Sequence, residues 1–204
     1  LALLGAALIR DFPEIYSWHS VKEFTFNDIR QTNRNELLWR DASVDGIKTG
    51  HTETAGYCLI VSAQRDGTRV ITVVMGTDGP KARLQATESL LNFVFRFYET
   101  RRLFSAGDVV TNSKVWKGAA ESLRLGIQSD LFVTVPRGAY GQLDAAAQVS
   151  GTVIAPVEKG SVHGSLVVRL EGEPLYERPL VALESVPEGG IFVRLKDEIR
   201  LLFH

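Results

Sequence analysis

Two stretches in the first half of the chain have the hydrophobic pattern of buried β-strands. Gly56–Ala63 and Arg69–Gly76 carry apolar, often β-branched side chains at nearly every position, which is typical of strands covered on both faces. The dipeptide Asp66-Gly67 between them favours a tight hairpin turn. We therefore expect an antiparallel hairpin in the interior of a domain.

Two other stretches have helical periodicity. Leu1–Arg10 is an apolar run that we read as the end of a core helix, because no basic region precedes it as in a signal peptide. Pro80 suits the first turn of a second helix over Lys81–Arg102, whose apolar stripe comprises Leu84, Leu91, Val94, Phe95 and Tyr98. This interpretation places Arg101 and Arg102 in the last turn, where cations favour the helix dipole. Asp11–Trp39, in contrast, is polar and predicts an irregular loop.

The pattern changes after Arg102 to short strands separated by glycines. The predicted strands are Asp108–Trp116, Glu121–Gly126, Leu131–Pro136, Gln142–Val149, Val162–Leu170 and Glu177–Val186. This spacing is typical of an all-β sandwich-like module. We expect a domain boundary near Leu103–Gly107.

The last segment, Ile191–His204, follows the hinge Gly189-Gly190 and is amphipathic. Its apolar stripe comprises Ile191, Phe192, Leu195, Ile199, Leu202 and Phe203. Such a helix either docks on its own domain or lies in a membrane interface. The pattern alone leaves both alternatives open.

Composition narrows the function classes. The 204 residues are 45% hydrophobic and 23% charged, with a net charge of −1, so no overall positive field favours nucleic acid. The single cysteine, Cys58, excludes a disulfide framework, and we expect it to be a buried thiol. His19, His163 and His204 lack metal-ligand spacing, so we predict no metal and no cofactor.

The strongest chemical signal is Lys48-Thr49-Gly50, immediately before the first predicted strand. This tripeptide on an edge strand is part of serine acyl-transfer enzymes. Lysine lowers the cost of forming an alkoxide, threonine offers a hydroxyl to a substrate carboxylate, and glycine leaves room for substrate backbone. The backbone N–H of His51 could serve an oxyanion. The alternative for Lys48 is an ordinary exposed strand lysine.

Longer motifs carry a family resemblance. The segment DGIKTGHTETAGYCLIVSA and the following VITVVMG resemble the D-alanyl-D-alanine carboxypeptidases of the low-molecular-mass penicillin-binding protein group. The resemblance continues through NRNELLW, FRFYET, VPRGAYGQL, RPLVAL and VPEGG. It implies an α+β chain: the C-terminal part of a serine DD-peptidase (β-lactamase-like) α/β domain over 1–102, an all-β domain over 103–188, and the start of an amphipathic anchor helix over 189–204.

The resemblance also implies roles for individual residues. Lys48, Thr49 and Gly50 correspond to the third active-site motif, with His51 next on the same strand. Arg34 and Arg83 correspond to arginines that approach the terminal carboxylate of a D-Ala-D-Ala stem peptide, a task suited to guanidinium groups. A surface salt bridge is the alternative for either arginine. The implied function is removal of the terminal D-alanine from peptidoglycan stem peptides, with β-lactams acylating the same serine.

The implied setting is the periplasmic face of the inner membrane, with Ile191–His204 as the start of a peripheral anchor to the membrane surface. The β domain is then a stalk or a module for protein partners. One feature departs from the family: no serine in the 204 residues has lysine three positions later, so the nucleophile motif Ser-x-x-Lys is missing. We expect these residues to be the C-terminal portion of a longer enzyme. The alternative is a non-catalytic cell-wall or partner-binding module, as a pseudoenzyme would be.

Overall fold

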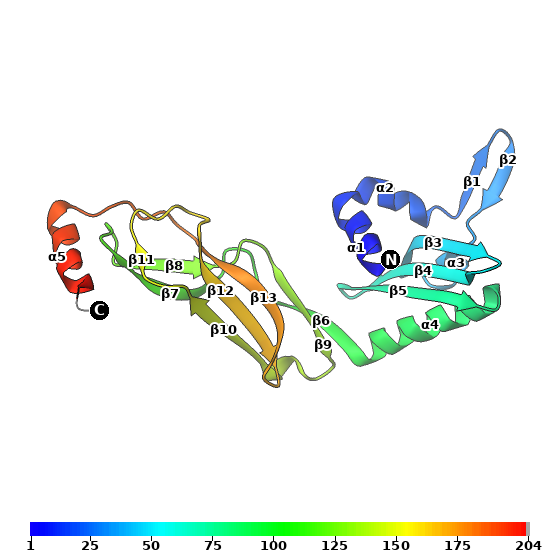
Figure 1. The fold of residues 1–204 in the computed structure, drawn as a ribbon. Helices are drawn as coiled ribbons and strands as arrows, with labels where there is room; N and C mark the ends of the chain where they lie inside the picture. The colour runs from blue at the N-terminus through cyan, green and yellow to red at the C-terminus, as the bar shows by residue number, and fades with distance from the viewer. Residues whose placement is uncertain (203–204) are drawn as a thin grey trace. The chain divides into compact units, whose positions relative to one another are not determined.

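The computed structural model describes residues 1–202 and divides the chain into two compact units, here called unit 1 (Leu1–Glu99) and unit 2 (from Thr100 onward). Figure 1 traces both units. The elements of unit 1 are α1 (Ala2–Asp11), α2 (Pro13–Ser17), the 3-10 turn η1 (Trp18–Ser20), β1 (Glu23–Phe26), β2 (Ile29–Thr32), α3 (Leu37–Arg40), β3 (Val44–Thr52), β4 (Gly56–Arg65), β5 (Thr68–Thr77) and α4 (Pro80–Phe97).

The centre of unit 1 is an antiparallel sheet in the order β3-β4-β5. The expected hairpin is confirmed, since β4 and β5 pair from Tyr57 to Thr77 around the turn at Asp66-Gly67. Alternate residues of β4 point to opposite faces. One set packs against α4 in a core that includes Leu59, Val61, Leu84 and Leu91.

The other face of the sheet is covered by α1 and α2. A Cβ on Gly5 of α1 would lie 2.9 Å from Ile47 and 3.7 Å from Ile71, so glycine permits the close approach of α1 to the sheet. Tyr16 of α2 is buried against this face. The sheet is therefore sandwiched between helices, as the apolar character of its strands predicted.

The prediction of an irregular loop over Asp11–Trp39 was wrong. The segment folds into α2, η1, the hairpin β1–β2 and the short helix α3. The residues of β1 and β2 are all exposed, and their only alternation of apolar and polar residues, at Phe24 and Phe26, is too short to distinguish a strand from a loop. Its turn at Asn27-Asp28 has positive φ at both residues, 47° and 59°, which Asn and Asp tolerate.

The predicted helix over 81–102 is also too long. α4 ends at Phe97, and Tyr98 begins strand β6 (Tyr98–Phe104). Arg101 and Arg102 therefore lie in a strand and not in a last helical turn, and Arg102 forms an ion pair with Asp130. The two units divide after Glu99, slightly before the expected boundary, because β6 pairs with a strand of unit 2.

Unit 2 is built from strands and one terminal helix. Its elements are β6, β7 (Val109–Trp116), β8 (Ser122–Gly126), β9 (Leu131–Pro136), η2 (Tyr140–Gln142), β10 (Leu143–Val149), β11 (Val153–Ile154), β12 (Val162–Leu170), β13 (Glu173–Ala182) and α5 (Ile191–Leu201). Most strands match their predicted ranges, but β13 begins and ends earlier than Glu177–Val186. The sheets have the orders β10-β12-β13-β8-β7-β11 and β6-β9. Two apolar clusters, one around Leu123 and Leu125 and one around Val133 and Leu166, form the core.

Candidate functional site

The Lys-Thr-Gly tripeptide lies on β3, an edge of the three-stranded sheet. Lys48, Thr49 and Gly50 face Ile60, Leu59 and Cys58 of β4 across the ladder. Within residues 1–202, no strand pairs with the other edge of β3. That edge can accept an extended peptide as an added strand.

The start of β3 is held by polar side chains. Asn35 is buried and donates from Nδ2 to the Gly46 carbonyl at 3.2 Å. Nδ1 of His19 donates to the Ile47 carbonyl at 2.9 Å. A Cβ on Gly46 would lie 2.9 Å from the Tyr16 hydroxyl, so this position needs glycine. These contacts stop where Lys48 begins, which leaves the tripeptide at the unpaired part of the edge.

The functional groups of the tripeptide are accessible. Lys48 is exposed, and its ammonium donates to the Thr49 carbonyl at 2.7 Å. Gly50 is exposed, and an added Cβ would contact Cβ of Cys58 at 3.7 Å. The Thr49 hydroxyl has no recorded partner among the described residues. A cation, a hydroxyl and a bare backbone therefore follow one another along the edge.

Arg83 of α4 reaches this strand. Its Nη1 donates to the Gly50 carbonyl at 3.3 Å and to the Cys58 carbonyl at 3.4 Å. The Tyr57 ring contacts both Arg83 and His51: the Arg83 guanidinium is 5.5 Å from its centroid, and the centroid of the His51 ring is 4.0 Å away. The structure therefore brings Arg83, Gly50 and His51 together, although Arg83 is distant in sequence.

Arg34 is placed differently. It is exposed, and no hydrogen bond or ion pair of its side chain is recorded within residues 1–202. Its neighbours are structural: Asn33 donates to the Val21 carbonyl at 3.1 Å and accepts from the Asn35 backbone at 3.0 Å. The two asparagines stabilise the turn, and the side chain of Arg34 between them is exposed.

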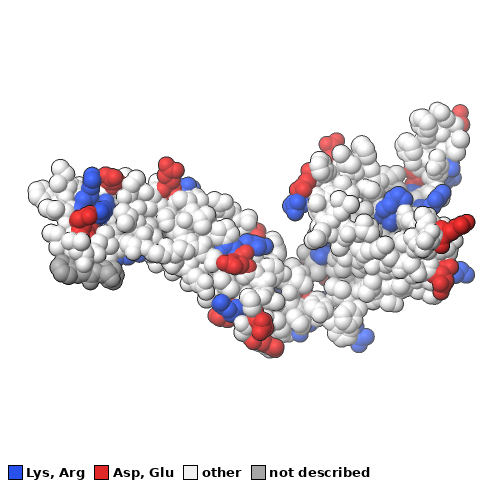
Figure 2. Space-filling view, viewed as in Figure 1, with Lys and Arg blue, Asp and Glu red and all other residues white. Residues whose placement is uncertain are grey.

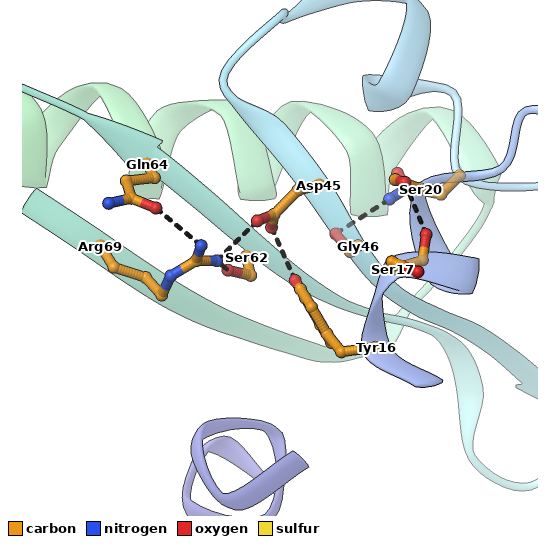
Figure 3. Close-up of polar contacts among 9 residues, drawn as sticks. Tyr16, Ser17, Ser20, Asp45, Gly46, Ser62, Gln64 and Arg69 are labelled. Carbon is orange, nitrogen blue, oxygen red and sulfur yellow. Dashed lines mark hydrogen bonds and ion pairs between the residues drawn. The ribbon is translucent and has the colours of Figure 1, made fainter. Parts of the chain in front are cut away.

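A polar cluster lies behind the first residues of β3. The Tyr16 hydroxyl donates to Oδ1 of Asp45 at 2.6 Å, and Arg69 donates to Oδ2 at 2.7 Å (Figure 3). Arg69 also donates to the hydroxyl of buried Ser62 at 2.6 Å and to Gln64 at 2.7 Å. Burial, together with the hydrogen bond to Asp45, raises the pKa of Tyr16 to about 12. The cluster joins α2 to all three strands of the sheet.

Sequence reasoning did not find Tyr57, Tyr16, Asp45 or Arg69 as neighbours of the candidate site. Asp45 lies three residues before Lys48, and that proximity in sequence was the only available signal. The expectation of a buried Cys58 was also wrong. Cys58 is partly exposed, and its Sγ lies 3.5 Å from the Ala55 carbonyl, because its side of β4 lies next to the bare Gly50.

The terminal helix α5 begins at Ile191, as predicted. Its stripe is exposed, from 53% at Ile199 to 88% at Phe192, whereas Phe203 lies outside the described residues. The helix nevertheless touches its own unit: Asp197 accepts from the Lys117 backbone at 2.7 Å, and Arg194 pairs with Glu188 at 2.8 Å. Polar residues dock the helix while the apolar stripe faces away. Across residues 1–202, every helix is too short or too polar to cross a membrane.

Comparisons with known proteins agree with this architecture. The family profile described as D-alanyl-D-alanine carboxypeptidase matches residues 1–79, and the one described as Penicillin-binding protein 5, C-terminal domain, matches residues 98–188. D-alanyl-D-alanine carboxypeptidase DacA of Escherichia coli (strain K12) is 43% identical over 206 residues, covering 100% of this chain and 51% of DacA. DacC of the same strain is 42% identical, covering 100% of this chain and 52% of DacC.

Among solved structures, penicillin binding protein 5 from Haemophilus influenzae superposes with a TM-score of 0.84 at 39% identity, covering 92% of this chain and 55% of that one. The chain spans about half the length of the curated relatives it matches. The two profiles cover successive parts of the sequence, and the relatives match it from end to end. The chain therefore belongs to the D-alanyl-D-alanine carboxypeptidase family of penicillin-binding proteins.

Proposed function

We propose that this chain supplies the Lys-Thr-Gly side of the active site of a serine-type D-Ala-D-Ala carboxypeptidase. The observation that carries the proposal is the position of the Arg83 guanidinium, 3.3 Å from the Gly50 carbonyl beside an unpaired strand edge. The open edge of β3 can pair with an extended peptide, and the nearby Arg83 guanidinium can bind the free carboxylate at the end of that peptide.

In this proposal, some residues bind the substrate and others stabilise the charges that develop during the reaction. The stem peptide pairs with the open edge of β3, and its terminal carboxylate binds the Thr49 hydroxyl and Arg83. Each charge-assisted hydrogen bond contributes about 1.5–3 kcal/mol. The Lys48 ammonium favours the alkoxide form of a serine nucleophile. The backbone N–H of His51 donates to the oxyanion of the tetrahedral intermediate.

The nucleophile is a serine in a Ser-x-x-Lys motif, which the 204 residues do not contain. Its oxygen attacks the carbonyl of the penultimate D-alanine, and the terminal D-alanine leaves as the free amino acid. Water then hydrolyses the acyl-enzyme. β-Lactams acylate the same serine because their strained amide takes the place of the peptide bond.

Fluorescent penicillin labelling of the complete natural gene product tests this proposal. We expect a covalent, denaturation-resistant label, together with release of D-alanine from a pentapeptide. A product that folds but neither takes up the label nor releases D-alanine would instead be the non-catalytic cell-wall or partner-binding module.

We also propose that α5 binds the periplasmic face of the inner membrane. The support is its outward stripe, with Ile191 79% and Leu202 78% exposed, although its polar residues are docked. Burying such a stripe in the headgroup region is favourable, and a single short helix binds reversibly.

The test is flotation with phosphatidylcholine vesicles. The variant Leu195→Asp/Ile199→Asp should lose binding, whereas Phe132→Asp/Leu175→Asp, which replaces two exposed apolar residues outside α5, should retain it.

A further inference from the structure

A charged cavity of about 270 Å³ lies between α5 and the β7–β8 region of unit 2. Its charged lining comprises three cations and two carboxylates, from Lys114, Lys196, Arg200, Glu121 and Asp197. Both a strand and a helix line the cavity, because Lys114 comes from β7 and the other two cations come from α5. None of these residues takes part in the proposed catalytic site.

The cations of this cavity are available to a ligand. Asp197 already accepts from the Lys117 backbone at 2.7 Å. Within residues 1–202, no ion pair or hydrogen bond is recorded for the side chain of Lys196 or Arg200. The Lys114 ammonium is 3.4 Å from the centroid of the Trp116 ring. Three cations against two carboxylates leave one net positive charge, which complements one anionic group.

The cavity adjoins the exposed apolar stripe of α5. At 100° per residue, Val193, Asp197 and Leu201 share the helix face toward unit 2, and the exposed stripe lies on the opposite face. Lys196 and Arg200 lie on the flank between these two faces. Figure 2 shows basic and acidic side chains side by side at the end of unit 2 that carries α5. When the stripe is buried in a bilayer, this flank lies at headgroup level.

We propose that the cavity binds the phosphodiester headgroup of an anionic phospholipid. Guanidinium and ammonium groups form charge-assisted hydrogen bonds with phosphate oxygens, and the apolar stripe next to them would place the acyl chains in the same bilayer. The proposal rests on the membrane binding of α5 proposed above. In addition to the helix, a residue of the β domain, Lys114, contacts the lipid headgroup.

Lys114 makes the proposal testable, because a helix that binds lipid by itself does not need it. The experiment is flotation of the 204-residue chain with phosphatidylcholine vesicles and with vesicles that also contain phosphatidylglycerol. The wild type should bind the anionic vesicles more tightly. Lys114→Gln/Arg200→Gln should lose about 25-fold in partitioning onto them, at roughly five-fold per cation, and should bind pure phosphatidylcholine unchanged.

The matched control is Lys159→Gln/Arg178→Gln, which removes two exposed cations of unit 2 outside the cavity. It should keep the preference for anionic vesicles. Equal losses in the two double variants would overturn the proposal, because the attraction would then be a diffuse charge effect. Equal binding of the wild type to both vesicle types would also overturn it, while leaving the anchoring proposal intact.

A second measurement does not depend on vesicle binding. Short-chain phosphatidylglycerol, monomeric in solution, should shift the amide NMR signals of Lys114, Lys196 and Arg200, and inorganic phosphate at the same concentration should shift them much less. Such shifts in a chain that does not float would support the cavity and contradict the anchor. Equal shifts with inorganic phosphate would contradict the lipid as ligand.

Discussion

The hydroxyl of Tyr16 donates a 2.6 Å hydrogen bond to the carboxylate of Asp45, on the same strand as the Lys-Thr-Gly tripeptide. Arg69 binds the other oxygen of this carboxylate at 2.7 Å. A helix and the two outer strands of the sheet therefore meet at one side chain. This arrangement fixes the part of β3 that precedes Lys48 and leaves the following residues free along the edge.

The Tyr16–Asp45 pair predicts a specific loss of stability in alkaline solution. Burial and the hydrogen bond raise the pKa of Tyr16 from 10.0 to about 12, so the folded state disfavours the tyrosinate. The stabilisation is complete below pH 10 and is lost as the pH rises through about 12. We expect the unfolding free energy, measured by urea titration at each pH, to fall in this window. The variant Tyr16→Phe should have a lower unfolding free energy at neutral pH, and this free energy should decrease less than that of the wild type as the pH rises. A parallel decrease in both proteins would contradict the assignment.

Lys48→Ala in the complete protein should slow acylation by penicillin by roughly 10²–10⁴-fold, the range for a residue that assists proton transfer or charge formation. The side chain is exposed, so the fold should tolerate the change. Stopped-flow acylation rates provide the measurement. Lys81→Ala, also exposed in unit 1, is the control and should acylate at the wild-type rate. An unchanged rate for Lys48→Ala would remove this lysine from the active site.

Arg83→Ala should distinguish a peptide that ends in D-alanine from its C-terminal amide. The loss of a charge-assisted bond of about 1.5–3 kcal/mol corresponds to a decrease of about ten- to hundredfold in kcat/KM for the acid. The amide should change much less because it carries no carboxylate. Arg96→Ala on the same helix is the control. Equal losses on both substrates would mean that Arg83 supports the strand and does not bind the carboxylate.

The core of unit 2 should be sensitive to cavities. Leu123 of β8 is fully buried in one of the two apolar clusters of this unit. Leu123→Ala should lower the unfolding free energy of this unit by about 2–5 kcal/mol, measured by urea unfolding followed through tryptophan fluorescence. Leu175→Ala removes the same atoms from an exposed position and should cost much less. Similar costs for the two variants would contradict the assignment of this core.

Much of the fold was predictable because its signals are local. The apolar runs of β4 and β5, the turn at Asp66-Gly67 and the amphipathic period of α5 each depend on residues close in sequence. The hairpin β1–β2 was not predictable, since its strands are exposed and the alternation of apolar residues extends only over Phe24 and Phe26. The end of α4 at Phe97 was missed because the helical stripe continues into Tyr98, where strand pairing determines the conformation instead.

The candidate site divides in the same way. The Lys-Thr-Gly motif, the family resemblance and the amphipathic character of the last segment follow from the sequence alone, because these are properties of neighbouring residues. Three relationships become visible only in the folded protein: Arg83 reaches the Gly50 carbonyl, Tyr16 and Arg69 both bind Asp45, and the apolar stripe of α5 faces outward. Those relationships depend on how the helices pack on the sheets and on which polar groups find partners, and residues distant along the chain meet only through that packing.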